Sequence, residues 1–306
     1  MIGAGALVRG AAEIVAPGSG AAWRARRRRR GAAVVLAYHN IVPDGQAIAG
    51  DRSLHLSQHS FGAQLDALIR THDVVPLAEI LEPGCPARPR AAITFDDAYR
   101  GAVTAGVSEV VRRGLPATIF VAPAFLGGRS FWWDRIATDR TGALDPSFRE
   151  DALDACAGRN DLVLARAERL GLPLTEPPSH ARAASLEELS IASDSPGITL
   201  GSHSWSHPNL ARLGGIELED ELRRPIAWLT ERFGHVVPWL AYPYGLSSPA
   251  TEHAVERAGY VAALRVSGGW IPPASELHRF ALPRLNVPNG MSARGFRLRL
   301  SGLWAR

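Results

Sequence analysis

Two adjacent carboxylates follow a short apolar stretch, and they are the first residues whose types and spacing suggest chemistry. Residues 91–95 (AAITF) are small, apolar and β-branched, which predicts a buried strand. Asp96 and Asp97 come directly after it. Because neighbouring residues of an extended chain point to opposite sides, one carboxylate can bind a metal ion while the other faces a substrate. The alternative is that one of them caps a helix beginning near Ala98, since Asp is a preferred N-cap residue.

Two further polar motifs also follow predicted strands. His203 and His207 come after residues 197–201, and Tyr244 lies in a Pro-Tyr-Gly turn after residues 236–241. Residues four apart on a helical turn lie on the same side, so the two imidazoles suit a shared metal ion. In barrels of parallel strands, functional side chains gather at the carboxyl ends of the strands. We therefore expect the three motifs to meet on one face.

The elements that must position these residues alternate between strands and helices. Apolar runs predict strands at 32–38, 74–75, 91–95, 117–121, 197–201, 236–241, 260–264 and 281–287. Apolar residues at helical spacing predict helices at 57–70, 102–113, from about 218 to 234, and 248–258. This alternation predicts parallel βα units and an α/β fold.

Residues 127–196 break the alternation and are interpreted as an inserted helical and loop segment over one end of the main fold. The insertion begins with a dense aromatic cluster that includes Trp132 and Trp133. These side chains either stack on sugar rings or pin the insertion to the core, and the second use is the commoner one.

Composition limits the possible classes of protein. The chain has 306 residues, 46% of them hydrophobic, which is enough for a large single core. No apolar run reaches the length of a membrane span. The net charge of +4 is local, because the arginines from Arg24 to Arg30 exceed it by themselves, so we predict no nucleic-acid partner. Cys85 and Cys156 show no CxxC spacing and predict neither a disulfide framework nor a cysteine metal site.

The polar motifs together resemble a known family. Thr94-Phe95-Asp96-Asp97, His203-Ser204-Trp205-Ser206-His207 and Tyr242-Pro243-Tyr244-Gly245 are similar to the first three motifs of the polysaccharide deacetylases, the NodB-homology group or carbohydrate esterase family 4. Residues 37–39 (AYH) and 116–121 (PATIFV) are also similar to that family. The resemblance covers roughly residues 34–287 apart from the insertion. It implies a distorted (β/α)7-type barrel, with about seven strands in place of the usual eight.

The resemblance also implies a mechanism. Asp97, His203 and His207 would hold a divalent metal ion, often zinc, with positions left open for water and substrate. Asp96 would be the general base, and the main-chain N–H of Tyr244 would stabilise the oxyanion. Such a metal lowers the pKa of water and polarises the carbonyl, which hydrolysis of an amide at neutral pH needs.

Two elements of the family pattern are missing. Many members carry an arginine two residues before the proline of the third motif, where it orients the catalytic aspartate, but Ala241 stands here. Arg284, in a predicted strand, is our candidate for a substitute. The Leu-x-His motif that supplies the general acid is not evident either. His278 is the nearest candidate in chain order and His39 is the other, and for each a surface or structural role is the alternative.

We thus predict three regions: a flexible extension at 1–31, a deacetylase domain at 32–290 with its insertion at about 127–196, and a basic C-terminal tail at 291–306. The predicted activity removes N-acetyl or O-acetyl groups from an acetylated glycan or glycan precursor. The alternatives are a hydrolase of small non-sugar amides and a non-catalytic metal-containing glycan-binding protein. Localisation stays open, because no convincing signal peptide is visible, and the segment from Arg24 to Arg30 is a candidate for membrane-surface contact.

Overall fold

The computed structural model describes residues 32–84, 86–136, 144–272 and 276–302. The N-terminal extension expected at 1–31, including the arginines from Arg24 to Arg30, lies outside the described residues. Cys85 and the last four residues of the expected C-terminal tail also lie outside them. Within the described ranges, no helix combines the length and the apolar character that a membrane span requires.

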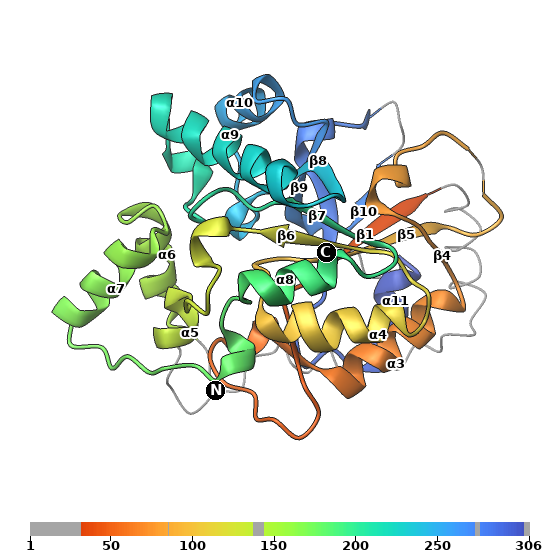
Figure 1. Ribbon diagram of the computed structural model, residues 1–306, viewed down its shortest axis with the longest axis horizontal. Helices are drawn as coiled ribbons and strands as arrows, with labels where there is room; N and C mark the ends of the chain where they lie inside the picture. Colours follow the sequence, from red (N-terminus) through yellow and green to blue (C-terminus); the bar gives the residue numbers. More distant parts are fainter. Residues whose placement is uncertain (1–31, 85, 137–143, 273–275, 303–306) are drawn as a thin grey trace.

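Seven parallel strands close into a barrel at the centre of the molecule (Figure 1). Their hydrogen-bonded order is β1–β11–β9–β8–β7–β6–β5, and the pairing of β5 with β1 closes the ring. The strands are β1 (Ala33–Tyr38), β5 (Arg90–Phe95), β6 (Ala117–Val121), β7 (Ile198–Ser202), β8 (Val236–Ala241), β9 (Ala262–Gly268) and β11 (Leu282–Asn286). The barrel confirms the α/β fold of about seven strands predicted from the sequence.

The barrel strands are apolar runs because both of their faces are buried. Every residue of β1 and of β6 is buried. Successive residues of β1 belong to different clusters: Val34 and Leu36 pack in the larger cluster with the surrounding helices, whereas Val35 packs with Ala92 and Phe120 in a second cluster. The alternation places one set of side chains inside the barrel and the other under the helices.

Short strands extend this framework. β4 (Asp73–Val74) pairs beside β5, close to the position predicted for a short strand, and β10 (Trp270–Ile271) runs antiparallel to β1. A separate two-stranded parallel sheet consists of β2 (Asn40–Val42) and β3 (His55–Ser57).

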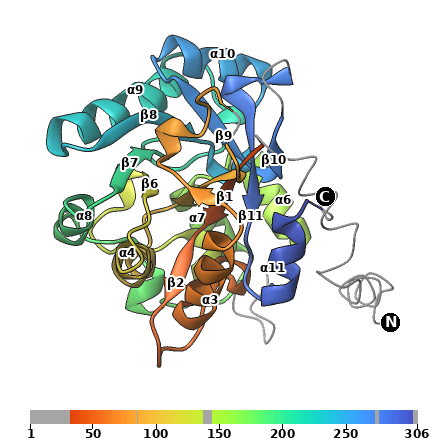
Figure 2. The same cartoon turned by 90° about the vertical axis from the view of Figure 1, so that its right-hand side faces the viewer.

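Helices surround the barrel (Figures 1 and 2). They are α3 (Gln58–Ile69), α4 (Val107–Val111), α8 (Leu186–Ser193), α9 (Gly215–Arg232), α10 (Pro249–Arg257) and α11 (Ala293–Leu300). Helix α11 falls within the segment expected as a basic tail. It lies against α3, and its Phe296 is buried in the main hydrophobic cluster.

The helix predicted over 102–113 differs in detail from the observed one. The observed helix starts with a π-helical turn, Ala102–Gly106, and continues as α4. Gly101 precedes this turn and lies very close to β2, since a Cβ atom at this position would be 2.2 Å from the carbonyl oxygen of Ile41. The approach therefore requires glycine at position 101.

Three helices between β6 and α8 lie together at one side of the barrel, on the left in Figure 1. They are α5 (Trp132–Ile136), α6 (Pro146–Asp154) and α7 (Asn160–Arg169). Trp132 and Trp133 are both buried, with relative exposures of 0% and 5%. Phe131 stacks on Phe125 and Trp133 at centroid distances of 4.3 and 4.7 Å. The aromatic cluster thus pins this segment to the core.

The carboxylate of Asp134, the residue after this tryptophan pair, is fully buried and accepts three hydrogen bonds. Its Oδ1 accepts from His55 Nε2 at 2.8 Å and from the Asp51 N–H at 2.9 Å. Its Oδ2 accepts from the Tyr99 hydroxyl at 2.6 Å. The hydroxyl of Tyr99 in turn accepts from Trp133 Nε1 at 2.8 Å. The network joins α5 to β3, and each of its hydrogen bonds has a donor and an acceptor.

We expect Asp134→Ala to lower the free energy of unfolding by about 3–5 kcal/mol, because it leaves several buried donors without an acceptor. Urea denaturation measures the change. Asp134→Asn is the matched control, since its amide oxygen still accepts hydrogen bonds, and it should lose less than half as much. A variant Asp134→Ala as stable as the wild type would show that the network does not hold α5.

Candidate active site

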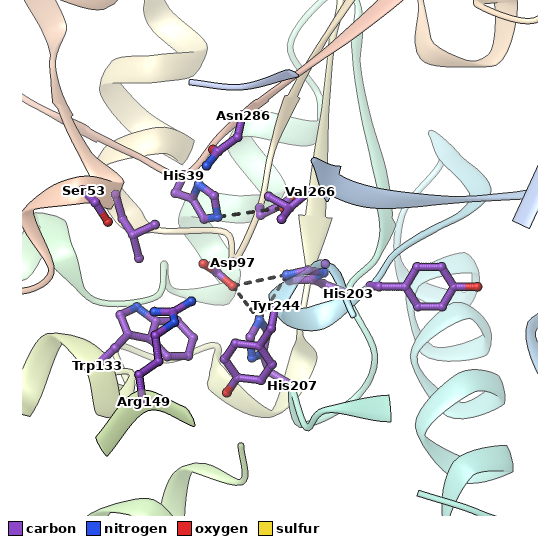
Figure 3. A pocket seen from close by; sticks show the side chains of 14 residues that line it. His39, Ser53, Asp97, Trp133, Arg149, His203, His207, Tyr244, Val266 and Asn286 are labelled. Carbon is purple, nitrogen blue, oxygen red and sulfur yellow. Dashed lines mark hydrogen bonds and ion pairs between the residues drawn. The ribbon is translucent and has the colours of Figure 1, made fainter. Parts of the chain in front are cut away.

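The three polar motifs converge at the carboxyl ends of three barrel strands (Figure 3). Asp96 and Asp97 follow β5, His203 follows β7, and Tyr244 lies in the turn after β8. The alternative of a helix cap does not hold, because Gly101 is the N-cap residue of the turn at Ala102–Gly106 and no side chain caps it.

The backbone is strained at the same three places. Among the described residues other than glycine, positive φ angles occur at Asp97 (69°), Ala98 (49°), Ala157 (49°), Ser204 (61°), His207 (59°) and Tyr244 (60°). Such conformations are unfavourable for residues with a Cβ and persist where the surrounding contacts impose them. Five of these six residues belong to the motifs or adjoin them. Contacts elsewhere in the fold therefore hold the motif side chains in place at a cost in backbone conformational energy.

Asp97, His203 and His207 form a compact buried triad. Asp97 Oδ1 lies 3.1 Å from His207 Nε2 and 3.4 Å from His203 Nε2. The two Nε2 atoms are 3.2 Å apart. All three side chains are buried, and their potential ligand atoms lie within 4.8 Å of one another. The triad brings together the three residues that the sequence suggested as metal ligands.

The donor atoms of the triad fit a divalent metal ion. His203 Nδ1 lies 2.7 Å from the Ala241 carbonyl oxygen, so it carries the proton and leaves the Nε2 lone pair facing the triad. Asp97 Oδ1 is buried and has no hydrogen-bond partner among the described residues. An orphaned carboxylate oxygen beside two imidazole nitrogens is the donor set of a tetrahedral zinc site with an open position.

Asp96 is held by a fully buried arginine of β11. Arg284 Nη1 donates to Asp96 Oδ1 at 2.7 Å, and Nη2 donates to Oδ2 at 2.6 Å. The guanidinium also donates to the Arg265 carbonyl at 2.8 Å and to Thr94 Oγ1 at 3.1 Å. Its relative exposure is 0%. The bidentate geometry fixes the plane of the Asp96 carboxylate from inside the barrel.

Arg284 and two nearby imidazoles keep Asp96 ionised. Burial by itself raises the pKa of this carboxyl, but the Arg284 guanidinium, together with His203 and His39, outweighs burial and holds the pKa below its usual value. Asp96 is therefore ionised at neutral pH. His39 Nε2 lies 4.0 Å from Asp96 Oδ2. Burial lowers the pKa of His39 despite the opposing effect of the two aspartates, so its imidazole is neutral at pH 7.

Tyr244 is locked in place by the segment after β6. Its hydroxyl donates to the Gly158 carbonyl at 2.7 Å and accepts from Trp132 Nε1 at 2.9 Å. A Cβ atom on Gly158 would lie 2.5 Å from the tyrosine ring, so this approach requires glycine. Burial raises the pKa of the Tyr244 phenol, which stays protonated. The side chain thereby anchors the turn, and its main-chain N–H is unbonded to any main-chain carbonyl of the described residues.

These residues surround a cavity of about 170 Å³. Figure 3 shows His39 and Asn286 on one side of Asp97, with Trp133 and Arg149 on the other. Trp133 also packs against His207, with ring centroids 5.1 Å apart. The helices between β6 and α8 therefore supply part of the wall.

The structure does not bring His278 to this cavity. Its side chain is 62% exposed and lies 3.5 Å from Glu252, in a separate surface hollow. His39 does line the cavity. Sequence reasoning did not single out Arg149 or Asn286, and neither residue stands in a motif that would have marked it.

Comparison with known proteins places the chain in a family. Residues 84–263, more than half of the sequence, match the polysaccharide deacetylase family model. The chain belongs to the polysaccharide deacetylase family, and it is a deacetylase-like hydrolase of non-peptide carbon–nitrogen bonds. This confirms the resemblance found in the motifs. No curated protein gives a significant match.

Solved structures share the fold at low sequence identity. The deacetylase PplD of Streptococcus pyogenes is 16% identical with a TM-score of 0.59, and the match covers 86% of this chain and 96% of PplD. IcaB of Ammonifex degensii is 18% identical with a TM-score of 0.58, covering 88% and 97%. The polysaccharide deacetylase BC0361 of Bacillus cereus is 16% identical with a TM-score of 0.60, covering 88% and 69%.

The ion pair in the barrel gives a test of how Asp96 is held. Arg284→Met leaves a buried carboxylate without its partner, and we expect the free energy of unfolding to fall by about 3–5 kcal/mol. Asp96→Asn in the same background removes the charge and should recover part of that loss. Urea denaturation of both single variants and the double variant measures the coupling. Strictly additive effects would show that the two residues do not depend on each other.

Proposed function

We propose that the protein removes N-acetyl, or O-acetyl, groups from a glycan or glycan precursor, with a divalent metal ion in the triad and Asp96 as general base. One observation carries the proposal. A buried carboxylate paired with Arg284 lies beside a separate set of potential cation ligands, and both line one cavity. Two neighbouring acids thus have different partners and different tasks.

Asp97, His203 and His207 are the residues that would hold the ion. Two imidazoles and one carboxylate favour zinc among the common divalent ions, because hard cations such as Mg²⁺ prefer oxygen ligands. A zinc ion there would act as a Lewis acid towards the acetyl carbonyl and lower the pKa of water.

Asp96 is suited to take a proton from water in the cavity. Its carboxylate is ionised, and its orientation is fixed by the bidentate contact with Arg284. A base that is already oriented needs little rearrangement during proton transfer. In this proposal Arg284 takes the part of the arginine that Ala241 replaces in the third motif.

Tyr244 and His39 complete the assignment. The turn that contains Tyr244 is anchored through its side chain, and its main-chain N–H is assigned to the oxyanion that forms at the acetyl carbon. His39 is assigned as the group that relays to the leaving nitrogen the proton that Asp96 takes from water, because its neutral imidazole lines the same cavity and its Nε2 lies 4.0 Å from Asp96 Oδ2. His278 is not assigned, since its exposed side chain lies in another hollow.

In this proposal an acetylated sugar unit occupies the reacting position in the cavity, with the rest of a glycan outside. Hydrolysis of a small non-sugar amide is the second candidate, because the same groups act on any acetamide that reaches them. The two candidate substrates differ in how far they contact the cavity wall formed by Trp133 and Arg149. A small amide would not contact this wall in full.

We expect the metal-loaded protein to release acetate from an N-acetylated oligosaccharide. A chelator should abolish the release, and added Zn²⁺ should restore it. Asp96→Asn should lower kcat by about 10²–10⁴-fold, because general-base catalysis contributes rate factors of that size. Acetate is measured enzymatically after incubation with a panel of acetylated glycans.

Asp44→Asn is the matched control, because Asp44 is exposed and does not line the cavity, and it should keep full activity. Turnover of small acetamides without turnover of any glycan would favour the second candidate. Binding of glycans without acetate release by the zinc-loaded protein would contradict the proposed activity.

A further inference from the structure

A glutamate on the outer helix α9 binds the turn that carries both histidines of the triad. Glu221 Oε2 accepts from the Trp205 N–H at 2.8 Å and from the Ser206 N–H at 2.9 Å. Its Oε1 accepts from the Ser206 hydroxyl at 2.5 Å. Glu221 is buried although it sits on a largely polar helix. One carboxylate thus engages the two residues at the centre of the His203–His207 turn.

The turn would not adopt this conformation by local preference. Ser204 and His207 flank the two bound residues, and both have positive φ angles, 61° and 59°. A pair of left-handed residues within four positions is costly for side chains with a Cβ, so outside contacts must impose it. The Glu221 carboxylate is placed between them and fixes the two amides that determine the path of the turn.

Neighbouring contacts hold the same turn from other directions. The Trp205 carbonyl accepts from the Ala124 N–H at 3.0 Å, and the His207 N–H donates to Ser204 Oγ at 3.0 Å. The guanidinium of Arg224, three residues after Glu221 on α9, lies 3.6 Å from the centroid of the Trp205 ring. Residues on one face of α9 therefore contact both the main chain and the side chain of Trp205.

We propose that Glu221 is a positioning residue for the metal site: its carboxylate holds the His203–His207 turn so that both Nε2 atoms face Asp97. Glu221 does not line the cavity, so it acts through the turn alone. The inference rests on the metal site of the proposed function. Partners that orient metal ligands in this way commonly set the affinity for the ion.

Three substitutions separate hydrogen bonding from charge and from packing. Glu221→Ala removes every acceptor from the turn. Glu221→Gln keeps an oxygen that can accept from both amides, and the Ser206 hydroxyl can accept from its new NH₂ group. Glu221→Asp keeps the charge, but its side chain is one methylene shorter and cannot reach all three donors. Glu219→Ala is the matched control, because Glu219 is an exposed acid on the same helix.

The experiment titrates each metal-free protein with Co²⁺ and follows both the affinity and the absorption bands of the bound ion. Glu221→Ala and Glu221→Asp should bind Co²⁺ about 10–100-fold more weakly than the wild type, the usual effect of losing an orienting partner. Glu221→Gln should stay within about threefold, since it preserves the orientation of the ligands. Glu219→Ala should match the wild type. Thermal unfolding of the metal-free proteins reports overall stability separately.

The outcomes separate this inference from the proposed function. Wild-type protein that fails to bind Co²⁺ would overturn the metal site and this proposal with it. Wild-type binding with equal affinity in Glu221→Ala would overturn the positioning role alone. If Glu221→Ala does not fold, the comparison of Glu221→Asp with Glu221→Gln decides: weaker binding by the aspartate variant supports the proposal, and wild-type affinity in both overturns it.

Discussion

The arrangement of the site depends on the ion pair between Asp96 and Arg284 inside the barrel. Two adjacent carboxylates at a buried strand end would repel each other and favour their protonated forms. Arg284 compensates the first one through two short hydrogen bonds. The second, Asp97, faces the opposite way toward two imidazoles and keeps an oxygen with no hydrogen bond to the described residues. Because the first charge is neutralised by the protein, the second remains available for a cation.

The barrel brings the other residues of the site to this pair of carboxylates. Parallel strands bring Asp96, His203 and Tyr244 to the same end although more than a hundred residues separate the first from the others. The segment between β6 and α8 closes the arrangement from outside, since Trp132 binds the Tyr244 hydroxyl and Trp133 packs on His207. The positive φ angles at the motifs show where tertiary contacts override local backbone preference.

Much of this could be predicted from the sequence because burial leaves a clear pattern. Strands enclosed on both faces are apolar runs, so their positions and the parallel α/β arrangement followed from the sequence pattern, whereas the seven-stranded barrel followed from the family resemblance. Polar residues that interrupt the ends of such runs stand out, which is why Asp97, His203 and His207 were recognised. Arg284 was predicted in another way, as the substitute for the arginine that many family members carry where Ala241 stands here.

Other residues left no such signal. Glu221 sits on a helix with many charged residues, where a buried acid cannot be told from a solvated one by sequence. Arg149 comes from a segment without a motif. His278 was considered for its position in the chain order, but order along the chain does not say which side of a loop faces the cavity, and its side chain turns outward to Glu252.

Anomalous diffraction from crystals grown with Zn²⁺ tests the central claim most directly. We expect one strong peak at about 2.0–2.2 Å from Asp97 Oδ1, His203 Nε2 and His207 Nε2. Asp96 should remain paired with Arg284 and should not ligate the ion. A peak coordinated by Asp96, or the absence of zinc from this triad in crystals that bind it elsewhere, would contradict the separation of roles between the two acids.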